Sequence, residues 1–204
     1  MPPEQPSRKQ LRAARRRLSR ADQAQHARRV AQQAGISQVF LRARRLGFYW
    51  PVDGELDPSP LLRIAERLGK QCYLPVLSPI RGKALGNKLL FARKLPAERI
   101  TRNRFGIPEP SRRGRHLAQP IALDLLVVPL VGFDPRCHRI GMGGGFYDRT
   151  LGYLRHHRHW RRPRLMGVAH ECQRIEAISP SPWDIQLDWI VTEARLYSSQ
   201  ADAN

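Results

Sequence analysis

"LDLLVVPLVGF", residues 123–133, carries the clearest strand pattern in the chain. Its apolar residues do not alternate with polar ones, which is typical of a strand buried on both faces of a parallel sheet. A glycine-rich loop follows at 139–150, "RIGMGGGFYDRT", and the residues from about Gly145 to His156 predict a helix. A buried strand, a tight loop and a helix in this order indicate an α/β protein.

The rest of the chain repeats this alternation of helices and short apolar strands. Apolar spacing predicts helices over 7–18, 19–34 and 60–68, with Ser19 and Asp22 capping the second. Further strands are predicted at 45–52, 71–77, 88–95, 164–170 and 187–193, whereas the Pro- and Gly-rich segment 101–120 predicts a loop. We expect a single α/β domain spanning 1–204, with an N-terminal helical segment and a mixed or mostly parallel sheet flanked by helices on both faces. Residues 1–6 and 196–204 are predicted to be disordered tails.

Composition narrows the class of protein further. No apolar run approaches the 18 or so residues of a transmembrane helix, and the basic N-terminus lacks the apolar stretch of a secretory signal. Three cysteines, Cys72, Cys137 and Cys172, are far apart, which argues against a disulfide framework and a zinc ribbon. We therefore expect a cytoplasmic protein with no membrane partner.

The formal net charge of +19 has two interpretations. A balance this basic favours a polyanionic partner such as a nucleic acid. However, nearly all the positive charge is arginine spread over the whole chain, with only five lysines, as a general preference for arginine would also produce. The charge alone does not distinguish the two.

The glycine loop also has two interpretations. Glycines let a phosphate approach backbone N–H groups at the start of a helix, or they serve only a closely packed turn. The loop is not a P-loop, since no Lys-Ser/Thr pair follows, nor a dinucleotide fingerprint, since Phe146 stands where the last glycine belongs. Asp148 is either a magnesium ligand or a carboxylate placed favourably on the helix dipole.

Five segments together resemble the 5-formyltetrahydrofolate cyclo-ligase family, also called 5,10-methenyltetrahydrofolate synthetases. They are "SRKQLRAARRRLS" (7–19), "FYWPVDGELDPSPLL" (48–62), "FGIPEP" (105–110), "LDLLVVPLVGFDPRCHRIGMGGGFYDRTL" (123–151) and "GVAHECQRIEAISPSPWDIQLDWIVTE" (167–193). The resemblance implies that ATP, with Mg²⁺, phosphorylates the formyl oxygen of 5-formyltetrahydrofolate. Ring closure by N10 then releases phosphate and gives 5,10-methenyltetrahydrofolate. Such a reaction asks the protein mainly for positioning and charge neutralisation.

The resemblance also implies roles for individual residues. The folate would contact Trp50 and Glu55, Mg²⁺ would be held by Asp148 and Asp184, and Arg139 and Tyr147 would take part in catalysis. The ATP-binding residues would be Arg8, Lys9, Arg12, Arg139, Gly141, Met142, Gly143, Gly144, Gly145, Phe146 and Tyr147.

Several of these residues have simpler interpretations. The helix arginines could form a solvated face, Tyr147 could belong to the core, and Asp184 could cap a turn while Asp188 competes for its role. Some family members carry an Arg and a Lys where this chain has Met142 and Gly144, so another cation must neutralise the phosphates: Arg139, Arg149 or an N-terminal arginine.

Rival classes remain beside the enzyme. They are a basic nucleic-acid-binding module and a folate- or nucleotide-binding protein without turnover. We expect no specific nucleic acid, because the aromatic residues lie in apolar strands or beside the glycine loop. We expect a monomer, and we interpret His156, His157 and His159 as a surface loop rather than a metal site.

Overall fold

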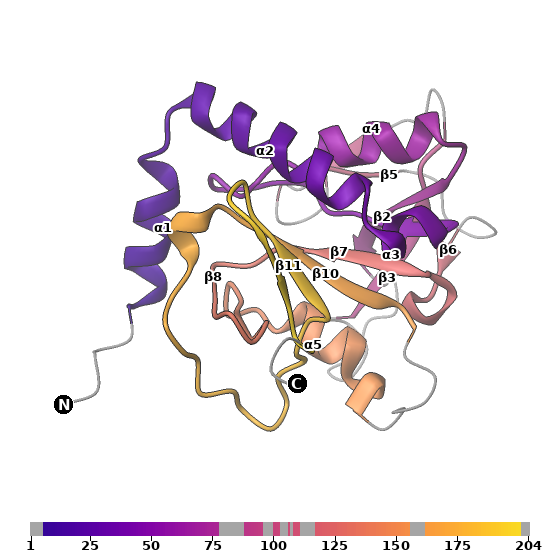
Figure 1. The fold of residues 1–204 in the computed structure, drawn as a ribbon. Helices are drawn as coiled ribbons and strands as arrows, with labels where there is room; N and C mark the ends of the chain where they lie inside the picture. The colour runs from indigo at the N-terminus through magenta and orange to yellow at the C-terminus, as the bar shows by residue number, and fades with distance from the viewer. Residues whose placement is uncertain are drawn as a thin grey trace.

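The computed structural model describes residues 6–77, 88–95, 100–102, 106, 108–110, 117–155 and 162–200. They form an eight-stranded sheet with helices on both faces (Figure 1). The helices and 3₁₀ turns are α1 (Arg8–Arg16), α2 (Arg20–Gly35), α3 (Gln38–Arg42), α4 (Ser59–Arg67), η1 (Pro120–Ala122), α5 (Phe146–Leu151), η2 (Gly152–Arg155) and η3 (Glu171–Gln173). Within these ranges no helix combines the length and the apolar character that a bilayer span requires.

The large sheet is mixed and mostly parallel, as the sequence predicts. The five strands from β11 to β2 run parallel, and antiparallel strands flank them at both edges. In sheet order the strands are β12 (Leu196–Ser198), β11 (Trp189–Val191), β10 (Arg164–Val168), β7 (Leu125–Val128), β1 (Arg45–Gly47), β2 (Gln71–Leu77), β3 (Leu89–Arg93) and β6 (Leu117–Ala118).

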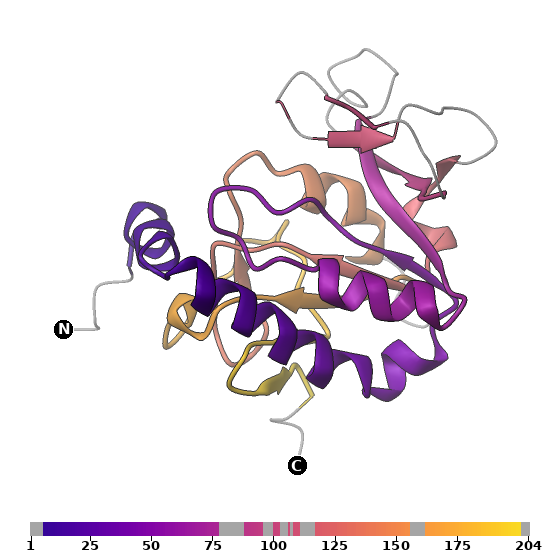
Figure 2. The same cartoon turned by 90° about the horizontal axis from the view of Figure 1, so that it is seen from above.

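Strand β7 lies between two hydrophobic cores. Leu125 and Val127 belong to the core under α2 and α4, whereas Leu126 and Val128 belong to the core on the α5 side. All four side chains are fully buried, which contributes roughly 1.5–3 kcal/mol each relative to exposure. The view from above shows the two helical layers on opposite sides of the sheet (Figure 2). The prediction of a strand buried on both faces is confirmed.

Two predicted boundaries in this region are wrong. The predicted strand 123–133 ends at Val128, because Pro129 lacks the N–H that would continue the ladder. The chain then forms a separate hairpin of β8 (Gly132–Phe133) and β9 (Arg139–Ile140). The helix predicted to reach His156 ends earlier, since α5 gives way to the 3₁₀ turn η2. His156, His157 and His159 lie outside the described residues.

Two segments predicted to be irregular are partly ordered strands. The predicted tail from 196 instead begins with β12, which pairs with β11 and is held by a hydrogen bond from the Tyr197 hydroxyl to Glu171 at 2.6 Å. The predicted loop 101–120 contains a two-stranded ribbon, β4 (Ile100–Arg102) and β5 (Pro108–Pro110). A ribbon of two strands tolerates prolines because each strand has one edge without a partner. Residues 1–5 and 201–204 lie outside the described part of the chain.

Candidate active site

The site forms where the order of the parallel strands reverses. From β1 the chain continues to β2 on one side, while β7, β10 and β11 follow on the other. The segments that leave the carboxyl ends of β1 and β7 therefore diverge over opposite faces and leave a crevice between them. The first segment carries Trp50 and Glu55, and the second leads into the glycine loop 141–145.

The glycine loop connects β9 to α5 and needs glycine at two positions. Gly143 has φ +96° and Gly145 has φ +61°, a conformation that side chains disfavour. Around Gly141 and Gly143, no atom of the described chain lies within 4 Å of the place where a Cβ would be. Close packing therefore does not explain these two glycines. Gly144 and Gly145 differ, since a Cβ at Gly144 would lie 3.1 Å from the Phe146 ring and a Cβ at Gly145 would lie 2.7 Å from the Arg149 guanidinium.

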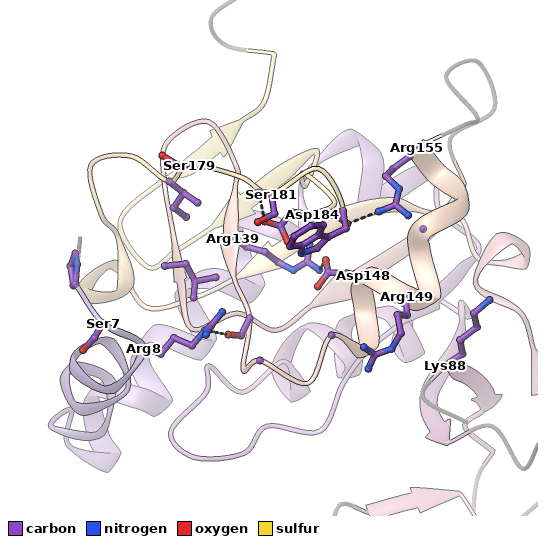
Figure 3. Close-up of a pocket in the computed structure, with 18 residues that line it drawn as sticks. Ser7, Arg8, Lys88, Arg139, Asp148, Arg149, Arg155, Ser179, Ser181 and Asp184 are labelled. Atoms are coloured by element: carbon purple, nitrogen blue, oxygen red, sulfur yellow. Dashed lines mark hydrogen bonds and ion pairs between the residues drawn. The ribbon is translucent and has the colours of Figure 1, made fainter. Parts of the chain in front are cut away.

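One side of the loop faces a cavity of about 860 Å³, here called the polar cavity (Figure 3). Side chains from both ends of the chain and from the residues that flank the loop, such as Arg139 and Asp148, point into it. Its charged lining residues are Arg8, Lys88, Arg139, Asp148, Arg149, Arg155 and Asp184. Five cations against two carboxylates make it suitable for a polyanion.

Hydrogen bonds hold these charged groups in place. Arg139 donates to the Ile185 carbonyl and to the Asp148 carboxylate, each at 2.5 Å. Arg8 donates to the Gly141 carbonyl at 3.0 Å, so the start of α1 is joined to the loop. The lining is thus assembled from α1, β9, the loop, α5 and η2, together with Lys88 and residues between 178 and 184.

Asp184 both caps a turn and lines the polar cavity. Its carboxylate accepts from the Ser181 N–H at 2.8 Å, and its side chain still faces the cavity that Asp148 lines. Asp188, the competing candidate, accepts from the Leu165 N–H at 2.7 Å and pairs with Arg164 at 3.2 Å, outside the cavity lining.

The other side of the loop faces a second cavity of about 330 Å³, here called the apolar cavity. Its wall is mainly apolar and aromatic, and includes Tyr49, Trp50, Leu130, Met142, Phe146 and Tyr147. Gly141, Gly145, Arg139 and Asp148 line both cavities. A ligand in each would therefore approach the other across this shared wall.

Glu55 supplies the acid within the apolar cavity. Its carboxylate accepts from the Val52 N–H at 3.1 Å and is buried, and burial raises its pKa to about 7. The indole N–H of Trp50 is buried and has no hydrogen-bond partner among the described residues. Buried donors are rarely left unpaired, so a ligand acceptor is expected beside it. Burial also raises the pKa of Tyr147 well above its ordinary value, which keeps its hydroxyl protonated.

A buried arginine that no sequence motif marks holds this side of the site together. Arg15 is completely buried, donates to the Asp53 carbonyl at 2.8 Å and to the Leu130 carbonyl at 3.2 Å, and lies 3.9 Å from Glu55. It therefore ties the segment after β1 to the segment after β7. Its spacing of four residues from buried Leu11 was the only sign in the sequence that it faces inward.

The predicted ATP-binding residues divide between several environments. Arg8 and Gly143 line only the polar cavity, whereas Arg139, Gly141 and Gly145 line both. The residues that line only the apolar cavity are Met142, Gly144, Phe146 and Tyr147. Lys9 lines neither cavity. Arg12 also lines neither, because its guanidinium pairs with Asp53 at 2.6 Å. Lys88 and Arg155 were missed, since no motif marks them.

Comparisons with known proteins agree with this geometry. The model of the 5-formyltetrahydrofolate cyclo-ligase family matches residues 2–193. A 5-formyltetrahydrofolate cyclo-ligase of Escherichia coli K12 is 36% identical over 92% of this chain and 98% of its own, and that of Haemophilus influenzae is 35% identical over 88% and 92%.

The fold agrees as well. The solved structure of the Aquifex aeolicus 5,10-methenyltetrahydrofolate synthetase superposes with a TM-score of 0.78 at 28% identity, covering 95% of this chain and 91% of the other. A family match over nearly the whole chain, relatives of similar length and the same fold lead to one conclusion: the chain belongs to the 5-formyltetrahydrofolate cyclo-ligase family.

Proposed function

We propose that this enzyme converts 5-formyltetrahydrofolate to 5,10-methenyltetrahydrofolate, with ATP in the polar cavity and the folate in the apolar cavity. One observation carries the proposal. Two cavities of opposite chemical character adjoin at a wall made of the glycine loop, Arg139 and Asp148. A reaction that transfers a phosphoryl group from a polyanion to a substituent of a flat ring system fits such an arrangement.

The polar cavity supports ATP binding through charge and space. Its five cationic side chains oppose the charge of a triphosphate, and the open space at Gly141 and Gly143 lets phosphate oxygens reach the loop backbone. Met142 and Gly144 bring no charge to the loop, so Arg8, Lys88, Arg139, Arg149 and Arg155 take over this role. Arg139 is the cation nearest to both partners, since it lines both cavities.

Asp148 and Asp184 fit a magnesium ion. Carboxylates are the ligands that Mg²⁺ takes from proteins in phosphate sites, with phosphate oxygens completing its shell. These are also the two acidic side chains on the polar cavity lining among the described residues. A bound Mg²⁺ would neutralise charge on the transferring phosphoryl group.

The apolar cavity supports folate binding by shape and by two polar groups. Aromatic side chains such as Trp50 and Tyr147 suit a flat pterin ring. The Glu55 carboxylate can accept from the N–H edge of the pterin, and the unpaired Trp50 N–H can donate to an acceptor of the ring.

The chemistry then runs in two steps across the shared wall. The formyl oxygen attacks the γ-phosphorus of ATP and ADP leaves, which turns a poor leaving group into a phosphate ester. N10 attacks the formyl carbon, its proton is lost to solvent, and the N5 lone pair expels phosphate. Arg139 holds the phosphoryl group in line and stabilises its negative charge, a contribution that depends on fixed placement.

An absorbance assay tests this function directly. Purified protein is mixed with 5-formyltetrahydrofolate, ATP and Mg²⁺, and the conjugated methenyl chromophore is followed. We expect the chromophore only with all three, and its loss in a folded Asp148→Ala protein. An Asp22→Ala protein, altered at an exposed helix start, should keep full activity. Folded wild-type protein that binds ATP and folate without forming the chromophore would favour the binding protein without turnover.

We further propose a monomer that acts in the cytoplasm. Both cavities are lined by residues of a single chain, so no second copy is needed to complete them. All three cysteines are free, and two of them, Cys72 and Cys137, are buried, as suits a reducing compartment.

A further inference from the structure

Outside both cavities, three metal-ligating side chains converge from three elements. His26 lies on α2, His170 follows β10, and Glu193 follows β11. The Nδ1 atoms of the two histidines are 3.0 Å apart, and His26 Nδ1 lies 3.4 Å from Glu193 Oε1. One ligand atom from each residue lies within 4.8 Å of both others. In Figure 1 the turn between β11 and β12 reaches toward α2, and Gln33 of α2 donates to the Glu193 carbonyl at 3.3 Å.

A single proton accounts for this arrangement. Two imidazole nitrogens at 3.0 Å need one hydrogen between them, since two bare lone pairs would repel. If His26 Nδ1 carries it, it can donate to His170 Nδ1 or to the Glu193 carboxylate, 3.4 Å away. Without that hydrogen, the two imidazole nitrogens and the carboxylate would present three lone pairs to one another. A divalent cation between them would relieve this repulsion.

Two of the three ligand separations are close to those around a tetrahedral ion. Bonds of about 2.0–2.1 Å at tetrahedral angles separate neighbouring ligand atoms by about 3.4 Å. The His26–Glu193 separation already has this length, and the two histidine nitrogens need to move apart by only a few tenths of an ångström. The His170 and Glu193 ligand atoms lie within 4.8 Å of one another and would approach as the ion binds. His26 and Glu193 keep 18% and 13% of their side chains exposed, which leaves a path for an ion and a place for water as fourth ligand.

The surrounding structure already fixes the ligands. Both Glu193 carboxylate oxygens accept from the Glu171 N–H, at 3.1 and 3.2 Å. The Glu171 carboxylate is itself occupied by the Thr192 and Tyr197 hydroxyls. His170 is completely buried, which disfavours a charged ring and favours the neutral form that a ligand must have.

We propose that His26, His170 and Glu193 form a binding site for Zn²⁺, separate from the ATP site. Two imidazoles and one carboxylate are a donor set that suits zinc better than magnesium. On binding, the proton between the rings leaves His26 Nδ1 and returns from solvent to His26 Nε2, so the ring stays neutral. The ion would join α2 to the ends of β10 and β11.

Competition with a chromophoric chelator tests the site in the full-length protein. We expect one Zn²⁺ per chain at this site, with affinity reduced about tenfold or more in His26→Gln and Glu193→Gln, because each loses one of three ligands. His138→Gln is the matched control. It removes another histidine–carboxylate pair, His138 with Asp134 at 3.0 Å, and should leave the affinity unchanged.

A second control addresses the histidine run of the sequence. A protein with His156, His157 and His159 all changed to Gln should keep the Zn²⁺ affinity.

Nitrogen NMR of the imidazoles should show that Zn²⁺ shifts the resonances of Nδ1 of His26 and of Nδ1 of His170. The proposal is overturned if folded wild-type protein binds no Zn²⁺, if both ligand variants bind as tightly as wild type, or if only other histidines respond.

Discussion

The two cavities share a wall, yet they recognise their ligands in opposite ways. Five cations and two carboxylates face the polar cavity, where the charges are held by one another and by main-chain carbonyls. The apolar cavity is lined mainly by aromatic and aliphatic side chains. Apart from Arg139 and Asp148 on the shared wall, its charged lining residue among the described residues is Glu55, whose burial raises its pKa to about 7. A polyanion such as a triphosphate is bound by many charges, whereas a pterin ring is oriented by a few polar groups that are held in fixed positions.

This difference makes the shared wall the place where chemistry must occur. Arg139, Gly141, Gly145 and Asp148 line both cavities, so the transferring phosphoryl group belongs beside them. Variants on the wall should affect both substrates. Variants on one side should affect one substrate and leave the other unchanged.

The largest effect is expected for Arg139→Gln. The change removes the cation that faces both cavities and frees its partner Asp148, so kcat should fall by roughly 10²–10³-fold. The methenyl absorbance assay measures this fall, with thermal unfolding as a check on the fold. A folded variant that loses less than about tenfold would place phosphoryl transfer away from Arg139.

Arg164→Gln is the control for this change. Arg164 pairs with Asp188 at 3.2 Å and stacks on Trp189 at 4.9 Å, but it lines neither cavity. The Arg164→Gln variant therefore loses the same guanidinium group as Arg139→Gln, but from strand β10. Its kcat and both KM values should stay within about twofold of wild type.

Asp184→Asn should separate the two cavities. Asparagine keeps an oxygen that can accept from Ser181, so the turn survives, but the charge for Mg²⁺ is lost. The Mg²⁺ concentration for half-maximal rate should rise about 10–100-fold. A titration of Mg²⁺ at saturating folate measures this rise. The folate KM should hardly change. An equal rise in the folate KM and in the half-maximal Mg²⁺ concentration would contradict the assignment of Asp184 to the ATP side.

Glu55 should give the folate side a pH dependence that the ATP side lacks. The ionised carboxylate accepts from the pterin more strongly than the protonated acid does, and the pKa of Glu55 is raised to about 7. The folate KM should therefore rise as pH falls through 7, while above 7 it should level off. Glu55→Gln should raise the folate KM about tenfold at high pH, by the roughly 1.5 kcal/mol of one hydrogen bond to a charged group, and should remove the pH dependence.

Steady-state kinetics across this pH range tests the expectation. The ATP KM serves as the internal control, since it should respond little to Glu55→Gln. A variant whose folate KM keeps the wild-type pH profile would show that another group titrates.

The fold was largely predictable because its central features are local in sequence. The uninterrupted apolar run around β7, the glycine loop and the helix spacing of α1, α2 and α4 each appear within a few residues. Strand β12 was missed because its residues become a strand only by pairing with β11. Such pairing depends on the partner strand more than on intrinsic preference.

The site was less predictable than the fold, because neighbouring residues of one sequence motif can face different cavities. The sequence assigned the whole loop to ATP, but Gly143 faces the polar cavity while its neighbours Met142 and Gly144 face the apolar one. Arg15 was missed for a related reason. Its role comes from Asp53 and Leu130, which are distant in sequence and are brought together only by the folded sheet.

The smallest and most local comparison concerns two neighbours on α1. Arg8 lines the polar cavity and holds the Gly141 carbonyl at 3.0 Å, whereas Lys9 is exposed and lines neither cavity. Consecutive helix residues point in directions about 100° apart, so only one of them can face the ligand.

Arg8→Ala should raise the ATP KM a few-fold, since exposed charge pairs contribute about 1 kcal/mol at most. Lys9→Ala, which removes the same charge, should change it by less than about twofold. Equal effects of both changes in steady-state kinetics would mean that α1 acts through general positive charge, and that the boundary of the polar cavity lies beyond Arg8.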